Sequence, residues 1–63
     1  MKTKYYIISA QDAHQLGITS FRQGNAQKGY LVNVGDFSTA TQDIIARAQE
    51  VTEQEALAFI ETL

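Results

Sequence analysis

The chain has 63 residues, a formal net charge of −2 and a hydrophobic fraction of 44%. A chain of this length forms a single domain, residues 1–63, whose core is small because short chains bury a smaller share of their surface. It has no cysteine and a single histidine, His14, which excludes disulfides and a structural zinc site. Self-association or close packing then remains as the source of extra stability.

No apolar run approaches the roughly 18 residues that a membrane helix needs. The first apolar run, residues 5–8, is also too short for the core of a signal peptide. We therefore expect a cytoplasmic protein that makes no membrane contact.

Residues 4–8 combine aromatic and β-branched side chains, which predicts a strand. Alternation along this strand leaves both of its faces apolar, which predicts either a central position in a sheet or packing against a partner on the second face. Ser9 is expected to cap a helix over residues 10–16. Gly17 suits the left-handed position that ends many helices.

Residues 18–22 predict a second strand and residues 30–34 a third. The polar segment 23–29 has a glycine near each end and predicts a hairpin connection between them. Gly35 and Asp36 then predict a turn.

The next predicted element is a helix over residues 40–48, capped by Ser38 or Thr39. Asp43 and Arg47 stand four residues apart, and on such a helix we expect them to form an ion pair.

The last part of the chain carries the strongest helix signal. Thr52 followed by Glu55 makes a capping box. Beyond it runs one apolar stripe at helical spacing, made of Ala56, Leu57, Phe59, Ile60 and Leu63. The preceding residues 48–51 either continue the earlier helix, which propensity favours, or form a short fourth strand.

A short pattern occurs twice and favours that strand. Residues 8–13 and 51–56 each read as an apolar residue, a hydroxyl cap, an acid three residues on, and then alanine. The first copy follows the strand predicted at residues 4–8, so the second copy is expected to follow a strand as well. Either an internal repeat or the same capping chemistry used twice explains the pattern.

Together these elements predict an α+β fold: a small sheet of three or four strands with two or three short helices packed on one face. The opposite face is then left with little covering. Tyr6, Phe21 and Tyr30 are the side chains expected to stand there.

The sequence offers little catalytic chemistry, and we predict that the protein is not an enzyme and binds no metal or cofactor. His14 has the pattern of a surface histidine, and Glu53 and Glu55 are explained by the helix start. Residues 24–29 lack the spacing of a phosphate-binding loop, because the second glycine leads into a strand rather than into a Lys-Ser/Thr pair and a helix.

The sequence predicts instead a protein-interaction module whose partners are proteins, a second copy of the chain among them. The doubly apolar first strand, the small core and the surplus of aromatic residues favour this function. The expected contact residues are Tyr6, Phe21, Arg22, Lys28 and Tyr30.

The alternative is a nucleic-acid-binding hairpin at residues 21–30. There Arg22 and Lys28 flank a loop, with Phe21 and Tyr30 behind it as stacking platforms. The negative net charge argues against this alternative.

Four stretches, residues 4–9, 16–17, 29–33 and 52–56, resemble short bacterial proteins to which no function is assigned. The shared motifs are strands and helix caps. The resemblance therefore implies no activity, substrate, cofactor or functional residue.

Overall fold

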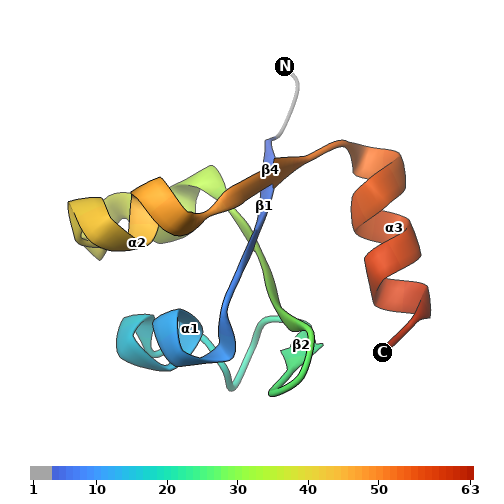
Figure 1. Cartoon of the computed structure of the whole chain (residues 1–63), viewed down its shortest axis with the longest axis horizontal. Helices are drawn as coiled ribbons and strands as arrows, with labels where there is room; N and C mark the ends of the chain where they lie inside the picture. The colour runs from blue at the N-terminus through green and yellow to red at the C-terminus, as the bar shows by residue number, and fades with distance from the viewer. Residues whose placement is uncertain (1–3) are drawn as a thin grey trace.

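The computed structural model describes residues 4–63, which form a four-stranded antiparallel sheet with helices on both sides (Figure 1). The strand order is β2-β3-β1-β4, so β1 lies inside the sheet, as its two apolar faces predict. In chain order the elements are β1 (Tyr5–Ile8), α1 (Ala10–Leu16), β2 (Gly24–Asn25), β3 (Gly29–Asn33), the 3₁₀ helix η1 (Val34–Thr39), α2 (Gln42–Arg47), β4 (Gln49–Val51) and α3 (Glu53–Glu61).

One face of the sheet is covered by α1 and η1. Tyr6 lies opposite Val32 and Ile8 opposite Tyr30, so these side chains share that face. Ile8 and Val32 are buried there in a cluster with two further buried residues, Ala13 of α1 and Ile18.

The other face is covered by α3. Ile7 lies opposite Leu31, and Tyr5 opposite Val51, which places all four side chains on this face. Leu31 and Val51 form a second buried cluster with Ala56 of α3. The Cα radius of gyration is 10.7 Å, against about 10.6 Å expected for a folded domain of this length, so both layers pack closely on the sheet.

The predicted α+β class and the strand and helix numbers are confirmed, but the helices cover both faces rather than one. The reason lies in the register of β1 and β4. Ile8 and Val51 each stand directly before a helix cap. Val51 pairs with Tyr5, and Tyr5 lies three residues before Ile8 in β1. Residues three apart on a strand face opposite ways, so the two helices begin on opposite faces.

The caps predicted at Ser9 and Thr52 both form. The Ser9 Oγ accepts the Asp12 backbone N–H at 3.1 Å, and Gly17 closes α1 with φ 70°. At α3 the Thr52 Oγ1 accepts the Glu55 N–H at 3.1 Å, and the Glu55 Oε1 accepts the Thr52 N–H at 2.9 Å. The repeated pattern thus produces the same strand–cap–helix unit twice, and the predicted strand before α3 is confirmed as β4.

The strand predicted over residues 18–22 is wrong, because this segment is a turn. The backbone N–H groups of Phe21 and Arg22 both donate to the Ile18 carbonyl, at 3.1 and 2.9 Å. Ile18 itself is buried in the α1-side cluster, which fixes the turn to the core. The strand starts later, as β2, and contains two residues.

The segment after β3 also differs from the prediction. The helix predicted over residues 40–48 begins at Gln42 and is capped by Thr41, whose Oγ1 lies 3.4 Å from the Ile44 nitrogen. Neither Ser38 nor Thr39 caps it, because both belong to η1. The turn predicted at residues 35–36 likewise lies inside η1.

Candidate functional site

Phe21 and Arg22 are the two predicted contact residues that the structure brings together at the surface. The Phe21 side chain is 62% exposed, the largest value among the exposed large hydrophobic residues of the described chain. The Arg22 guanidinium lies 5.2 Å from the centre of the Phe21 ring. Both residues stand in the turn between α1 and β2.

A short network holds Arg22 in place. Its Nη2 donates to Oδ1 of Asp36 at 2.8 Å, and its Nε makes an ion-pair contact with Oδ2, also at 2.8 Å, without hydrogen-bond alignment. Oδ2 of Asp36 also accepts the Asn33 backbone N–H at 3.1 Å. The carboxylate therefore ties the turn to the end of β3 and to η1, and it neutralises the arginine.

A cavity of about 250 Å³ adjoins this turn. It lies where the two-residue β2 stops and leaves the rest of β3 without a neighbouring strand on that edge. Its lining residues are Tyr5, Phe21, Arg22, Gln23, Leu31, Val32 and Asn33. We call Phe21, Arg22 and this cavity the Phe21 surface.

Tyr6, Phe21 and Tyr30 were predicted to stand on an uncovered sheet face. Phe21 lies instead in a turn outside the sheet, and the face that carries Tyr6 and Tyr30 is covered by α1 and η1. Both rings are half-buried and pack against the α1-side cluster. The Tyr6 ring also meets Phe37 of η1 edge to face, with centroids 5.1 Å apart.

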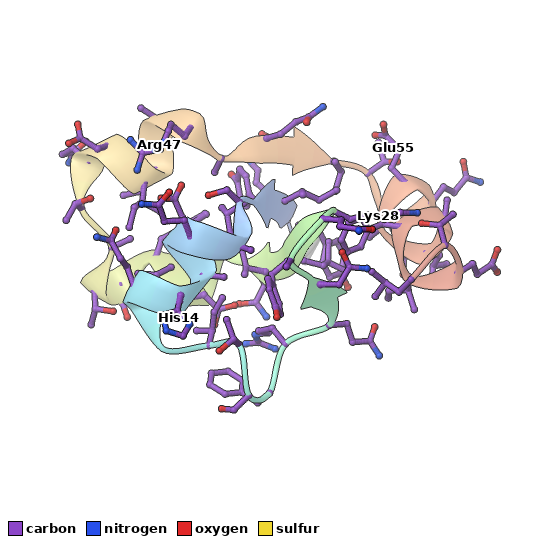
Figure 2. All side chains as sticks on the ribbon, turned by 60° about the horizontal axis from the view of Figure 1, so that its bottom comes forward. His14, Lys28, Arg47 and Glu55 are labelled. Atoms are coloured by element: carbon purple, nitrogen blue, oxygen red, sulfur yellow. The ribbon has the colours of Figure 1, made fainter. Side chains whose placement is uncertain are left out.

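Lys28 lies apart from the Phe21 surface, in the turn between β2 and β3. Its Nζ donates to the Thr62 carbonyl at 2.8 Å, at the end of α3. Figure 2 shows Lys28 beside that helix. It lines a second cavity, of about 330 Å³, together with Arg47, Ser9, Gly29 and other residues at this end of the sheet.

Arg47 is not paired with Asp43 as predicted, but with Asp12 of α1. Its Nη2 and Nε donate to the two Asp12 carboxylate oxygens at 2.8 and 3.1 Å. Asp12 is only 4% exposed. These hydrogen bonds hold the pKa of Asp12 below its ordinary value, although burial acts in the opposite direction. The pair joins α1 to α2 and is explained as a structural contact.

The described residues show no convergent set of catalytic groups. His14 is exposed on α1, and Figure 2 shows it well separated from Arg47, Lys28 and Glu55. Within residues 4–63, no three His, Cys, Asp or Glu side chains gather in a way that would hold a metal ion. That the protein is not an enzyme stays a prediction.

Comparison of the chain with protein-family models, with curated proteins and with solved structures gave no match. The comparisons therefore give no support to a bacterial origin and assign no functional residue to this chain. In the part of the chain that the structure describes, every helix is too short or too polar to cross a membrane.

Sequence reasoning identified the exposed aromatic and its arginine but missed the group that holds them. Asp36 was read only as part of a turn. Asp36 lies three residues after Asn33. At this spacing a side chain can accept the backbone N–H of the residue that caps a helix, so the sequence carried a signal for the contact between Asp36 and Asn33. Tyr5 and Leu31 of the cavity carried no signal beyond strand periodicity.

Proposed function

We propose that this chain is a small non-enzymatic protein-interaction module that contacts its partner through the Phe21 surface. The observation that carries the proposal is a phenylalanine ring, 62% exposed, fixed beside a cavity by the Arg22–Asp36 pair. Aromatic residues and arginine are the side chains most enriched at protein interfaces.

The fixed position of the ring matters as much as its exposure. The Arg22 guanidinium lies over the ring at cation–π distance, Asp36 holds Arg22, and the turn backbone is bonded to the buried Ile18. A contact residue ordered before binding loses less conformational entropy on association. The surface therefore has the character of a binding hot spot.

The other exposed large hydrophobic side chains are distributed singly over η1, α2 and the α3 region: Val34, Ile45, Leu57 and Leu63. Single exposed aliphatic residues are ordinary on protein surfaces. None of these four lines the cavity beside Phe21.

Binding of nucleic acid through residues 21–30 has less support. Arg22 is neutralised by Asp36, and Lys28 is bonded to the end of α3. Tyr30 packs against the core rather than offering a free ring. Phosphate binding depends on unneutralised cations and base stacking on accessible rings.

Selection of random peptides displayed on phage, with the folded wild-type chain as the target, tests the proposal. Enriched peptides are expected to carry apolar anchors and to bind Phe21→Ser at least about tenfold more weakly, as for a contact hot spot. Leu57→Ser is the matched control, because Leu57 is also exposed, at 56%, but lies on α3. Circular dichroism confirms that both variants are folded.

Enriched peptides that bind both variants as well as the wild type would contradict the proposed surface. Failure to enrich any peptide would count against an interaction function altogether.

A further inference from the structure

We propose that the occupant of the Phe21 surface is a second copy of this chain, in a two-fold dimer in which each Phe21 ring enters the cavity of the other copy. This rests on the proposed function and names its partner. It is carried by the shape of the surface, its charge and the state of the sheet edges.

The shape of the surface is self-complementary. A two-fold interface uses the same patch on both copies, so a protruding group and its receptor site must lie together on one surface. Here the protruding Phe21 itself lines the cavity, and Tyr5 and Leu31 are among the other lining residues. The volume of about 250 Å³ is large enough to admit a phenyl ring, and the pocket is open to solvent with a mixed polar and apolar lining.

The charge of the surface also permits self-contact. Among the described residues that line the cavity, Arg22 is the one ionised group, and Asp36 neutralises it at 2.8 Å, so this arginine does not drive two copies apart. The second cavity is different, because Lys28 lines it with a charge that no carboxylate pairs with, while its other cation, Arg47, is neutralised by Asp12. Like charges brought together in an interface disfavour association.

The exposed leucine of α3, in contrast, is flanked by negative charges. Leu57 stands four residues from both Glu53 and Glu61, so these acids flank it on the helix surface. A two-fold contact through that part of α3 would bring the acids of two copies together.

The sheet edges are poor sites for pairing with another copy. In β4, Glu50 pairs with Tyr6 of β1. The backbone groups of Tyr6 face β3, on the other side of β1, so the N–H and C=O of Glu50 point away from β1 and toward the free edge of the sheet. A two-fold pairing of β4 strands would therefore set Glu50 against Glu50, and like charges directly opposite destabilise a strand pair. The opposite edge strand, β2, has only two residues.

Sedimentation equilibrium of the wild-type chain between about 10 µM and 1 mM tests the inference. The contact is small, so we expect a weak dimer with a Kd of about 0.1 to 1 mM. Phe21→Ser removes the ring from both copies and is expected to raise the Kd at least about tenfold. Leu57→Ser is expected to leave it unchanged. Raising the salt concentration to 1 M should not weaken a contact that does not depend on unpaired charges.

Isotope-filtered NMR on a mixture of labelled and unlabelled wild-type chains supplies a second readout that needs no variant. It should show intermolecular contacts between the Phe21 ring and the Leu31 methyl groups. A chain that is monomeric at 1 mM, or a dimer that Phe21→Ser leaves intact, overturns the inference. If the chain is monomeric while Phe21-dependent peptides are still selected, this inference fails and the proposed function stands.

Discussion

Replacement of Gly29 by alanine is expected to unfold this domain, whereas the same change at Gly17 should be tolerated. Both glycines have positive φ, 88° and 70°. A left-handed backbone costs a residue with a Cβ about 1–2 kcal/mol. Around Gly17 a new Cβ meets nothing within 4 Å, so that strain is the whole cost.

At Gly29 the new Cβ would press on the carbonyl oxygen of Ile8 in the neighbouring strand, closer than real atoms approach. Relief requires this end of β1 and β3 to separate, which loses ladder hydrogen bonds worth about 0.5–1.5 kcal/mol each and loosens the packing of Ile8. The total cost is therefore at least about 3 kcal/mol. The whole domain is stable by only about 3–9 kcal/mol.

Urea denaturation followed by circular dichroism at 222 nm measures both variants. The three tyrosines and the absence of tryptophan make tyrosine fluorescence a second probe. We expect Gly17→Ala to lose about 1–2 kcal/mol, at roughly 4–8 °C in Tm for each kcal/mol, and Gly29→Ala to be unfolded or close to it. Equal losses at the two positions would refute the close approach of Gly29 to β1.

Three further predictions concern the caps, the buried carboxylate and the core. Ser9→Ala and Thr52→Ala should each lower the free energy of unfolding by about 1 kcal/mol in urea titrations, and a loss at only one position would contradict the equivalence of the two caps. Because the folded-state pKa of Asp12 is lowered, its contribution is full above about pH 4, its ordinary range, and is lost as the pH falls through the folded-state value. Asp12→Asn should therefore reduce the fall in the free energy of unfolding that the wild type shows at acid pH. If that fall is unchanged in Asp12→Asn, a group other than Asp12 causes it. Val32→Ala, at 2% exposure, should cost about 1.5–3 kcal/mol, whereas Val34→Ala, at 58%, should cost about 0.5 kcal/mol or less; thermal unfolding separates them.

The elements that local rules specify were predicted to within a residue or two. The strand at Tyr5–Ile8 and the helix at Ala10–Leu16 follow from side-chain type, a hydroxyl cap and a terminal glycine, all read within one segment. The segment 18–22 was misread, because its apolar and β-branched residues satisfy a strand pattern. Ile18 is instead buried in the core, and within residues 4–63 this segment pairs with no strand.

The candidate site was likewise predicted only where it depends on residues that are close in sequence. Phe21 and Arg22 are neighbours in the chain, so their meeting at the surface needed little more than a turn. Tyr6 and Tyr30 were expected on an uncovered face, because strand alternation says which residues share a face but not which helix covers it. The placement of Lys28 beside α3 depends on a hydrogen bond across 34 residues.

The two copies of the repeated pattern separate local from tertiary control. Each hydroxyl accepts the backbone N–H three residues on, because cap geometry depends only on a few adjacent residues. The acids at the same position differ: Glu55 returns to its own cap, whereas Asp12 binds Arg47, 35 residues away. Likewise the caps set where α1 and α3 begin, but the pairing of Val51 with Tyr5 set them on opposite faces. Contacts between residues that are distant in sequence have no local signal. In this chain such contacts decide which group each acid binds and which face of the sheet each helix covers.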